Sequence, residues 1–267
     1  MSERKIFDFV QGDSPLLVSM PHVGTSVPSA MSERMTAQAR SFPDTDWHVH
    51  QLYDFLEELG VSTLKANYSR YVVDLNRAPG GESLYPGQSV TEVCPTTLFN
   101  DQPIYNHGSE PDKAEISARI DTYWQPYHNC IDIELKRIRD KFGYAVLLDA
   151  HSIKSRVPRF FEGQLPDFNW GTADGSSCDP LLGERLLAES TAVFPYTPIL
   201  NGRFKGGFIT RNNGRPNESI HAVQLELSQA TYMDDEDSFE ISPAKADLLR
   251  STLKGLVTVL LNHFDKK

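Results

Sequence analysis

The sequence predicts an α/β fold in which helices cover both faces of a single sheet. Apolar strand-like runs alternate with amphipathic helical patterns along most of the chain, and this alternation is typical of such sheets. The run Tyr144 to Asp149 (YAVLLD) is apolar along most of its length, as expected for a strand that is covered on both faces. The 267 residues fit one large domain or two small ones, and we expect a single domain over residues 1–267.

The first half of the chain predicts three strands and two helical stretches. The strands are expected at residues 15–20, 62–67 and 70–75. Apolar residues at three- and four-residue spacing predict a helix over residues 46–59, which Gly60 ends. Residues 79–97 are rich in Gly, Pro, Ser and Thr and predict a long loop. Residues 111–142 predict a long helical stretch that Pro126 kinks or splits.

The second half alternates in the same way. A strand at residues 144–149 is followed by a loop-like segment at residues 152–178 that contains several Gly and Pro residues. A helix is expected at residues 179–193, a strand at 219–227 and a C-terminal helix at 243–264. Ligands of open α/β sheets bind beyond the carboxyl ends of the strands, and the polar motifs of this chain follow or end predicted strands.

The overall composition limits the classes of function. The hydrophobic fraction of 39% and charged fraction of 23% are ordinary for a globular enzyme. The formal net charge of −10 argues against a nucleic-acid partner. No stretch approaches the ~20 apolar residues that span a bilayer, and no secretory signal is evident, so we expect a cytoplasmic protein. The widely spaced Cys94, Cys130 and Cys178 are interpreted as buried free thiols.

Two histidines at the ends of predicted strands suggest a metal site. His22 follows the first apolar strand in SMPHVG, and His151 follows another in LLDAHS. A single such histidine is more often structural, but two in one α/β sheet favour a shared metal. We expect a turn after Asp149 that lets its carboxylate orient His151.

A catalytic zinc ion usually takes a third protein ligand from a carboxylate. The segment FPDTDWHVHQL offers Asp46, just before the predicted helix, with Asp44 as the alternative. An aspartate at a helix start is also a common N-cap. His48 and His50 are expected on the helix surface.

Glu226 in AVQLELSQ is the candidate general acid/base. Its apolar neighbours Val223, Leu225 and Leu227 point to the other side of the predicted strand. A solvent-facing strand would give the same pattern, so the functional interpretation depends on Glu226 lying near the carboxyl edge of the sheet.

Two basic segments suggest an anionic substrate. SRYVVDLNRAP places Arg70, Asn76 and Arg77 around a predicted strand, and NGRFKGGFITRNNG contains Arg203, Lys205 and Arg211 in a glycine-rich loop or hairpin. Guanidinium groups match carboxylates bidentately and stabilise oxyanions. The alternatives are a surface salt-bridge network for the first segment and a solvated basic turn for the second.

Several motifs together resemble the N-formylglutamate amidohydrolase family. They are PHVGTSVP, DTDW, SRYVVDLNRAP, LLDAHS and IHAVQLELSQATYM, and the resemblance covers about residues 15 to 233. DFNWGTADGSSC and NGRFKGGFITRNNG look like the deformylase branch of that family, which acts in histidine breakdown. The family is similar in fold to zinc carboxypeptidases and aspartoacylases. The resemblance therefore implies a three-layer α/β/α sandwich with a mixed, mostly parallel sheet of the phosphorylase/hydrolase-like type.

The resemblance also implies roles for individual residues. His22 and His151 become zinc ligands; the position where those relatives keep a glutamate ligand holds Thr25, so Asp46 supplies the carboxylate. Glu226 becomes the acid/base and Arg70 assists at the scissile carbonyl. Asn76 with Arg77 binds one substrate carboxylate, and Arg203 or Arg211 binds the other.

The expected activity is zinc-dependent hydrolysis of N-formyl-L-glutamate, a small dicarboxylic substrate, to formate and L-glutamate. One alternative is a related zinc amidohydrolase or carboxypeptidase acting on another N-acyl amino acid. Another is a non-catalytic protein that binds acidic metabolites. A site of two histidines and one aspartate also accepts Co, Mn, Fe or Ni.

Overall fold

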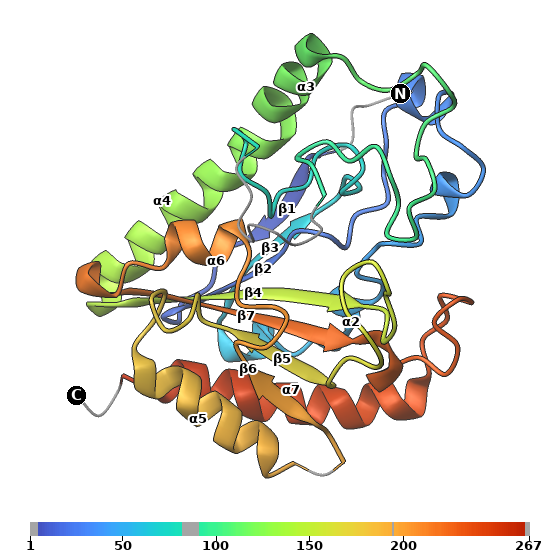
Figure 1. The fold of residues 1–267 in the computed structure, drawn as a ribbon. Helices are drawn as coiled ribbons and strands as arrows, with labels where there is room; N and C mark the ends of the chain where they lie inside the picture. Colours follow the sequence, from blue (N-terminus) through green and yellow to red (C-terminus); the bar gives the residue numbers. More distant parts are fainter. Residues whose placement is uncertain (1–4, 82–90, 194, 265–267) are drawn as a thin grey trace.

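A computed structural model describes residues 5–81, 91–193 and 195–264 of the chain. Its strands form one sheet in the order β1-β3-β2-β4-β7-β5-β6 (Figure 1). They are β1 (Phe7–Val10), β2 (Leu16–Met20), β3 (Ser62–Ala66), β4 (Ala145–Ile153), β5 (Phe168–Gly171), β6 (Pro198–Leu200) and β7 (Ile220–Ser228). The four central strands are parallel, β1 and β5 run antiparallel to their inner neighbours, and β6 pairs parallel with β5. The predicted mixed, mostly parallel sheet is confirmed.

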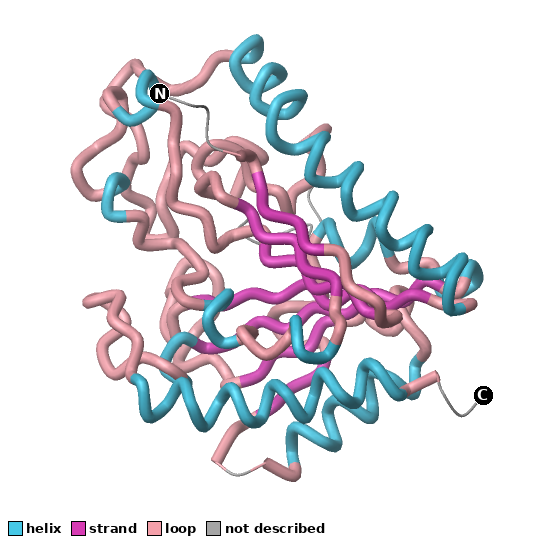
Figure 2. The backbone as a smooth tube through the Cα atoms, turned by 180° about the vertical axis from the view of Figure 1, so that it is seen from behind, coloured by secondary structure: helices cyan, strands magenta, loops and turns pink. Residues whose placement is uncertain are grey.

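Helices cover both faces of this sheet, which gives three layers (Figures 1 and 2). One face packs against α4 (Gln125–Phe142) and α6 (Phe208–Asn213), and the other against α2 (Val49–Leu52), α5 (Pro180–Thr191) and α7 (Pro243–Asn262). Alternate strand residues point to opposite faces, so Leu17 and Leu147 lie in the core under α4 whereas their neighbours Val18 and Leu148 lie in the core over α7. In the ranges described, no helix has the length and apolarity needed to cross a membrane.

The predicted helical stretch at residues 111–142 is confirmed as three consecutive parts. They are α3 (Lys113–Arg119), a π-helical turn (Ile120–Trp124) and α4. Pro126 is the second residue of α4, and the helical backbone runs into it from the π-helical turn. Because proline has no N–H to continue the bonding of the preceding turn, the change from π- to α-helix falls next to it, at Trp124 and Gln125. The predicted split near Pro126 is therefore found. Short helices fill the connections: α1 (Ser29–Ser32) and 3₁₀ turns at Ala39–Ser41, Glu57–Leu59, Pro216–Glu218 and Gln229–Thr231.

Two predicted elements are wrong. The helix expected over residues 46–59 is reduced to α2 and one 3₁₀ turn. His48 has a left-handed backbone (φ 62°), so α2 begins only at Val49, and the backbone of Tyr53 (φ −108°) leaves the helical region after Leu52. The strand expected over residues 70–75 is a series of turns, and its polar side chains bond to the site described below. Strands β1, β5 and β6 were not predicted, and β5 lies inside the expected loop at residues 152–178. Of the loop predicted at residues 79–97, positions 82–90 lie outside the described residues.

Strand β4 extends further than predicted and places two polar residues in the middle of the sheet. It continues to Ile153, so the turn expected after Asp149 is wrong. Residues two apart in a strand share a face, and Asp149 and His151 therefore point the same way. The other expected elements, at residues 15–20, 62–67, 179–193, 219–227 and 243–264, are confirmed within a few residues.

Candidate active site

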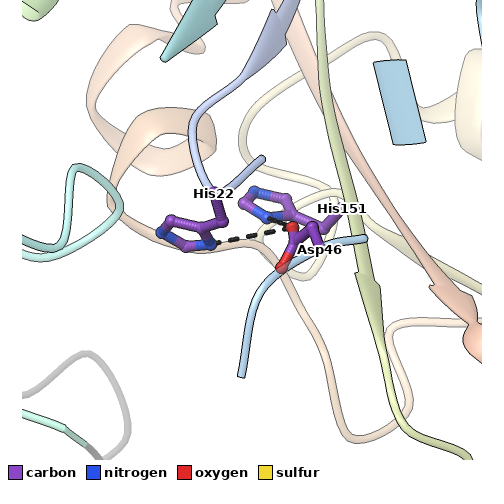
Figure 3. Close-up of side chains that lie close together, drawn as sticks. All are labelled: His22, Asp46 and His151. Carbon is purple, nitrogen blue, oxygen red and sulfur yellow. Dashed lines mark hydrogen bonds and ion pairs between the residues drawn. The ribbon is translucent and has the colours of Figure 1, made fainter. Parts of the chain in front are cut away.

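His22, Asp46 and His151 form a buried group at the carboxyl edge of the central strands (Figure 3), and we call these three residues the metal group. One ligand atom from each lies within 4.8 Å of the other two. Asp46 Oδ2 is 3.0 Å from His151 Nδ1 and 3.8 Å from His22 Nδ1. His22 follows β2, His151 lies in β4, and the backbone N–H of Asp46 donates to the carbonyl oxygen of His22 (3.0 Å). The three residues predicted as metal ligands are thus brought together.

The opposite edge of each imidazole faces a further buried carboxylate. His22 Nε2 lies 2.8 Å from Asp74 Oδ1, and His151 Nε2 lies 3.0 Å from Asp149 Oδ2. Both aspartates are fully buried. A carboxylate that accepts a hydrogen bond from Nε2–H fixes the tautomer and leaves Nδ1 as the ligand atom. Both Nδ1 atoms face Asp46, so the donor set of two imidazole nitrogens and one carboxylate fits a divalent metal such as zinc.

Asp74 connects the metal group with two neighbouring residues. Its carboxylate accepts from Arg70 Nη2 (2.6 Å) and from the backbone N–H of Asn76 (2.9 Å) in addition to His22. Burial opposes its ionisation, but Arg70, Arg77 and His22 hold the pKa of Asp74 well below its usual value. Asp74 is therefore an anion in the protein interior, and the sequence suggested for it only a salt bridge to an arginine.

Asn76 is bonded to protein groups through both ends of its amide. Its Nδ2 lies 3.1 Å from Asp149 Oδ2 and 3.0 Å from His151 Nε2. Because Asp149 Oδ2 also contacts His151 Nε2, this carboxylate oxygen accepts from both residues. Asn76 Oδ1 accepts from the backbone N–H of Ile209 at the start of α6 (2.8 Å). The amide thus links the metal group to α6.

Glu226 lies beside His151 in the neighbouring strand β7, where the two residues are register partners. It is 7% exposed, and burial raises the pKa of its carboxyl to about 8. The side-chain amide of Gln224 donates to Glu226 Oε2 (3.4 Å), and Gln224 Oε1 accepts from the backbone N–H of Gly207 (2.7 Å). The solvent-facing alternative for this strand is wrong, since every residue of β7 is buried.

A small cavity joins these groups, and we call it the catalytic cavity. It has a volume of about 70 Å³, and its lining combines the two histidines and Glu226 with three arginines. The lining residues are His22, Arg70, Asn76, Arg77, Phe99, His151, Ser152, Ile153, Phe160, Arg203, Phe204, Gly207, Gln224 and Glu226.

The remaining predicted residues lie elsewhere. Arg211 is not among the residues that line the cavity, and its Nε donates to the carbonyl of Gly206 (2.8 Å). Lys205 pairs with Asp174 on the surface. The Asp44 carboxylate accepts from the hydroxyl of Tyr71 and the N–H of Phe99, so Asp46 rather than Asp44 joins the metal group.

Several residues of the site were not predicted from the sequence. They are the hydrogen-bonding residue Gln224 and the aromatic residues of the cavity wall, Phe99, Phe160 and Phe204. For Gln224 a signal exists, because it stands two residues before Glu226 in the same strand and therefore shares its face. The aromatic residues come from loops far apart in the sequence, where no pattern marks them.

The chain is similar to known proteins over most of its length. A sequence model of the N-formylglutamate amidohydrolase family matches residues 14–233. The N-formylglutamate deformylases of Pseudomonas putida and Pseudomonas aeruginosa are 48% and 49% identical to this chain over 257 residues, which is 96% of each protein.

Solved structures show the same fold. The crystal structure of an N-formylglutamate amidohydrolase from Ralstonia eutropha JMP134 superposes with a TM-score of 0.82 and 25% identity over 97% of this chain and 98% of that one. A protein from Agrobacterium tumefaciens has the same fold with a TM-score of 0.68 and 18% identity over 97% of both chains. The chain belongs to the N-formylglutamate amidohydrolase family.

Proposed function

We propose that this protein hydrolyses N-formyl-L-glutamate to formate and L-glutamate, as the last step of a histidine degradation route. The observation that carries the proposal is the buried His22–Asp46–His151 group next to Glu226, in a cavity lined by three arginines. The names of the two Pseudomonas relatives support the same substrate.

His22 and His151, each through Nδ1, and Asp46 through its carboxylate would hold one zinc ion. Zinc in such a site lowers the pKa of a bound water to about 7 and polarises a carbonyl group. Other divalent metals can occupy the same donor set, and Co, Mn, Fe or Ni are the alternatives. Asp74 and Asp149 orient the two imidazoles, and removal of such partners typically weakens metal binding by about 10–100-fold.

Glu226 is proposed as the general acid/base. Its carboxylate takes the proton of the attacking water and delivers it to the leaving amine nitrogen, so that the C–N bond breaks without release of a strongly basic amide anion. Its burial beside the metal group and its raised pKa suit a carboxyl group that must both accept and donate a proton near neutral pH.

Arg70 is proposed to stabilise the negative charge that develops on the formyl oxygen. Its guanidinium is buried and held by Asp74 at 2.6 Å, and Arg70 Nε has no hydrogen-bond partner among the described residues. A group that is fixed in advance loses little entropy when the oxyanion forms.

The two carboxylates of the substrate are proposed to bind Arg77 and Arg203, which line the catalytic cavity. Guanidinium groups suit carboxylates, and local cations are needed in a chain with a net charge of −10. Asn76 is better placed to hold Asp149 and α6 than to bind substrate, since both ends of its amide have protein partners. Arg211 is an alternative only if its segment moves.

Release of formate from N-formyl-L-glutamate tests the proposal. The purified protein is expected to release formate and glutamate in equal amounts, and a chelator is expected to abolish turnover until zinc is returned. Stoichiometric binding of N-formylglutamate without turnover in the zinc-loaded protein would instead indicate a binding protein.

A further inference from the structure

The catalytic cavity shares one wall with a much larger cavity. This second space, which we call the lateral cavity, has a volume of about 670 Å³. Three residues line both spaces, namely Phe99, Ser152 and Ile153. The lateral cavity is lined by the chain neighbours of two residues of the metal group, namely Thr45, which precedes Asp46, and Ser152, which follows His151.

The position of Arg70 indicates where the acyl group of a substrate would lie. Arg70 is proposed to hold the formyl oxygen, and its guanidinium carbon lies 4.7 Å from the centre of the Phe99 ring. The substituent on the acyl side of the scissile carbonyl is therefore next to the shared wall. Arg77 and Arg203, proposed to bind the glutamate part, line the catalytic cavity and not the lateral cavity.

We propose that Phe99 and Ile153 determine the acyl specificity of this enzyme by closing the catalytic cavity against the lateral cavity. The inference rests on the proposed hydrolysis of N-formylglutamate. With the wall in place, the acyl group is limited to formyl. With the wall opened, the lateral cavity accepts a longer acyl chain, and the same hydrolysis releases a larger carboxylate together with glutamate.

The wall is held rigidly. The ring of Phe99 lies 4.7 Å from the guanidinium carbon of Arg70 and packs edge-to-face against Phe160 at 4.9 Å. The N–H of Phe99 donates to Asp44 Oδ2 (3.0 Å). Ile153 is the last residue of β4 and pairs in register with β7. Neither side chain can yield to a larger acyl group without breaking these contacts.

Two other residues line the catalytic cavity and not the lateral cavity. Arg203 and Phe204 lie in the connection between β6 and α6, and connections outside regular structure rearrange on binding more readily than strands do. A volume of about 70 Å³ does not hold a whole N-formylglutamate, so these two side chains shift to admit the glutamate part. Ile153 belongs to β4 and stays in place, and Phe99, which lies in a turn, is held by the contacts given above.

The chemistry of the lateral cavity suits an uncharged chain. Two of its cationic residues are ion-paired, Lys154 with Asp237 (2.5 Å) and Lys245 with Asp234 (3.0 Å), and the third, Arg156, is exposed. The lining holds more carboxylates than cations, namely Asp44, Asp234, Asp235, Glu236 and Asp237, which disfavours an anionic ligand. Val157 and Met233 contribute buried apolar surface to its lining. A short aliphatic acyl group therefore fits better than an anionic one.

The test compares N-formyl-, N-acetyl- and N-butyryl-L-glutamate as substrates of the zinc-loaded wild type and of Phe99→Ala and Ile153→Ala. One methylene group in a fitted pocket changes kcat/KM by roughly 10–200-fold, so the wild type is expected to prefer formyl strongly. In both variants the butyryl-to-formyl ratio of kcat/KM is expected to rise at least tenfold. Phe204→Ala is the matched control, because it removes the same side chain from a residue that lines the catalytic cavity and not the lateral cavity, and it should leave the ratio unchanged.

Inhibition by formate and by butyrate gives a second readout that does not depend on turnover of poor substrates. Butyrate should inhibit Ile153→Ala more strongly than the wild type. This variant keeps the contact between Phe99 and Arg70, so it still tests the inference when Phe99→Ala is inactive. Unchanged ratios and unchanged butyrate inhibition in both wall variants would overturn the inference. The inference would also be overturned if the wall variants gained activity only toward N-formyl amino acids with larger side chains. A wild type inactive on N-formylglutamate would refute the proposed function itself, which separates the two failures.

Discussion

The substitution Asn76→Ala distinguishes between two roles for Asn76: binding of the substrate, as expected from the sequence, and positioning of Asp149 and α6, as its contacts indicate. The amide of Asn76 holds Asp149 Oδ2 at 3.1 Å and the N–H of Ile209 at 2.8 Å. The substitution removes both partners inside a buried region, where Asp149 Oδ1 already has no partner among the described residues. Within the described part of the chain, the side chain of Asp149 then retains its contact with His151 alone.

The size of the effect follows from these two contacts. A buried polar group that loses its hydrogen-bond partner costs about 1–3 kcal/mol. The Ile209 N–H and the Asp149 carboxylate are two such groups, so the free energy of unfolding should fall by roughly 2–6 kcal/mol. Because Asp149 orients the ring of His151, zinc affinity should also fall by about 10–100-fold.

Three measurements on one preparation test this reasoning: urea unfolding, zinc affinity by competition with a chelator, and kcat and KM at saturating zinc. We expect weaker zinc binding and a lower kcat with a nearly unchanged KM. The matched control is Asn213→Ala, which removes a buried amide that bonds to the Ile209 carbonyl in the same helix without contact to Asp149. A raised KM with wild-type zinc affinity would refute a positioning role and return Asn76 to the substrate site.

Three further predictions address other residues. Glu226→Gln should lower kcat by at least ~100-fold with zinc content unchanged, and near-wild-type turnover of the folded variant would remove Glu226 from the mechanism. Arg77→Ala should raise KM for N-formylglutamate more than it lowers kcat, with zinc content again unchanged; an unaltered KM would contradict its role. Burial lowers the pKa of His128 from 6.5 to about 4. Because the unfolded chain takes up this proton first as the pH falls, wild type should lose about 3 kcal/mol of stability between pH 6.5 and 4. His128→Gln should show a shallower loss in urea midpoints, and equal pH dependence would contradict this assignment.

The sequence predicted the central strands and the long helices because they bury continuous or periodic apolar faces. The run at residues 144–149 and the C-terminal helix at 243–264 are examples, since their burial is decided by local pattern. The outer strands β1, β5 and β6, of which β1 and β6 form the edges of the sheet, have three or four residues each, which is too short for a periodic signal. Their pairing depends on neighbours that are distant in the chain.

The segment at residues 70–75 shows where pattern fails. RYVVDL has the β-branched residues of a strand, yet Val72 and Val73 are buried in a turn and in irregular backbone. Arg70 and Asp74 bond to each other, and Asp74 also bonds to His22, so the segment is held by side-chain contacts rather than by a sheet ladder. Such contacts to a distant histidine cannot be read from local periodicity.

The metal group could be predicted from the sequence because two of its residues mark the ends of buried strands and the third matches a family motif. The residues that surround it could be predicted only in part. Asp149 is two residues from His151, so the two side chains point to the same face of the sheet when the strand is taken to continue through His151. Asp74 reaches His22 across 52 residues, a contact that exists only in the folded chain.

Formate release from N-formyl-L-glutamate, followed on one sample before chelation, after chelation and after zinc is returned, tests the central claim most directly. The account predicts turnover with about one zinc per chain, loss of turnover when zinc is removed, and recovery when it is restored. It also predicts that His22→Ala neither retains zinc nor recovers activity. Full formate release by a protein that contains no bound metal would contradict the proposed site at His22, Asp46 and His151.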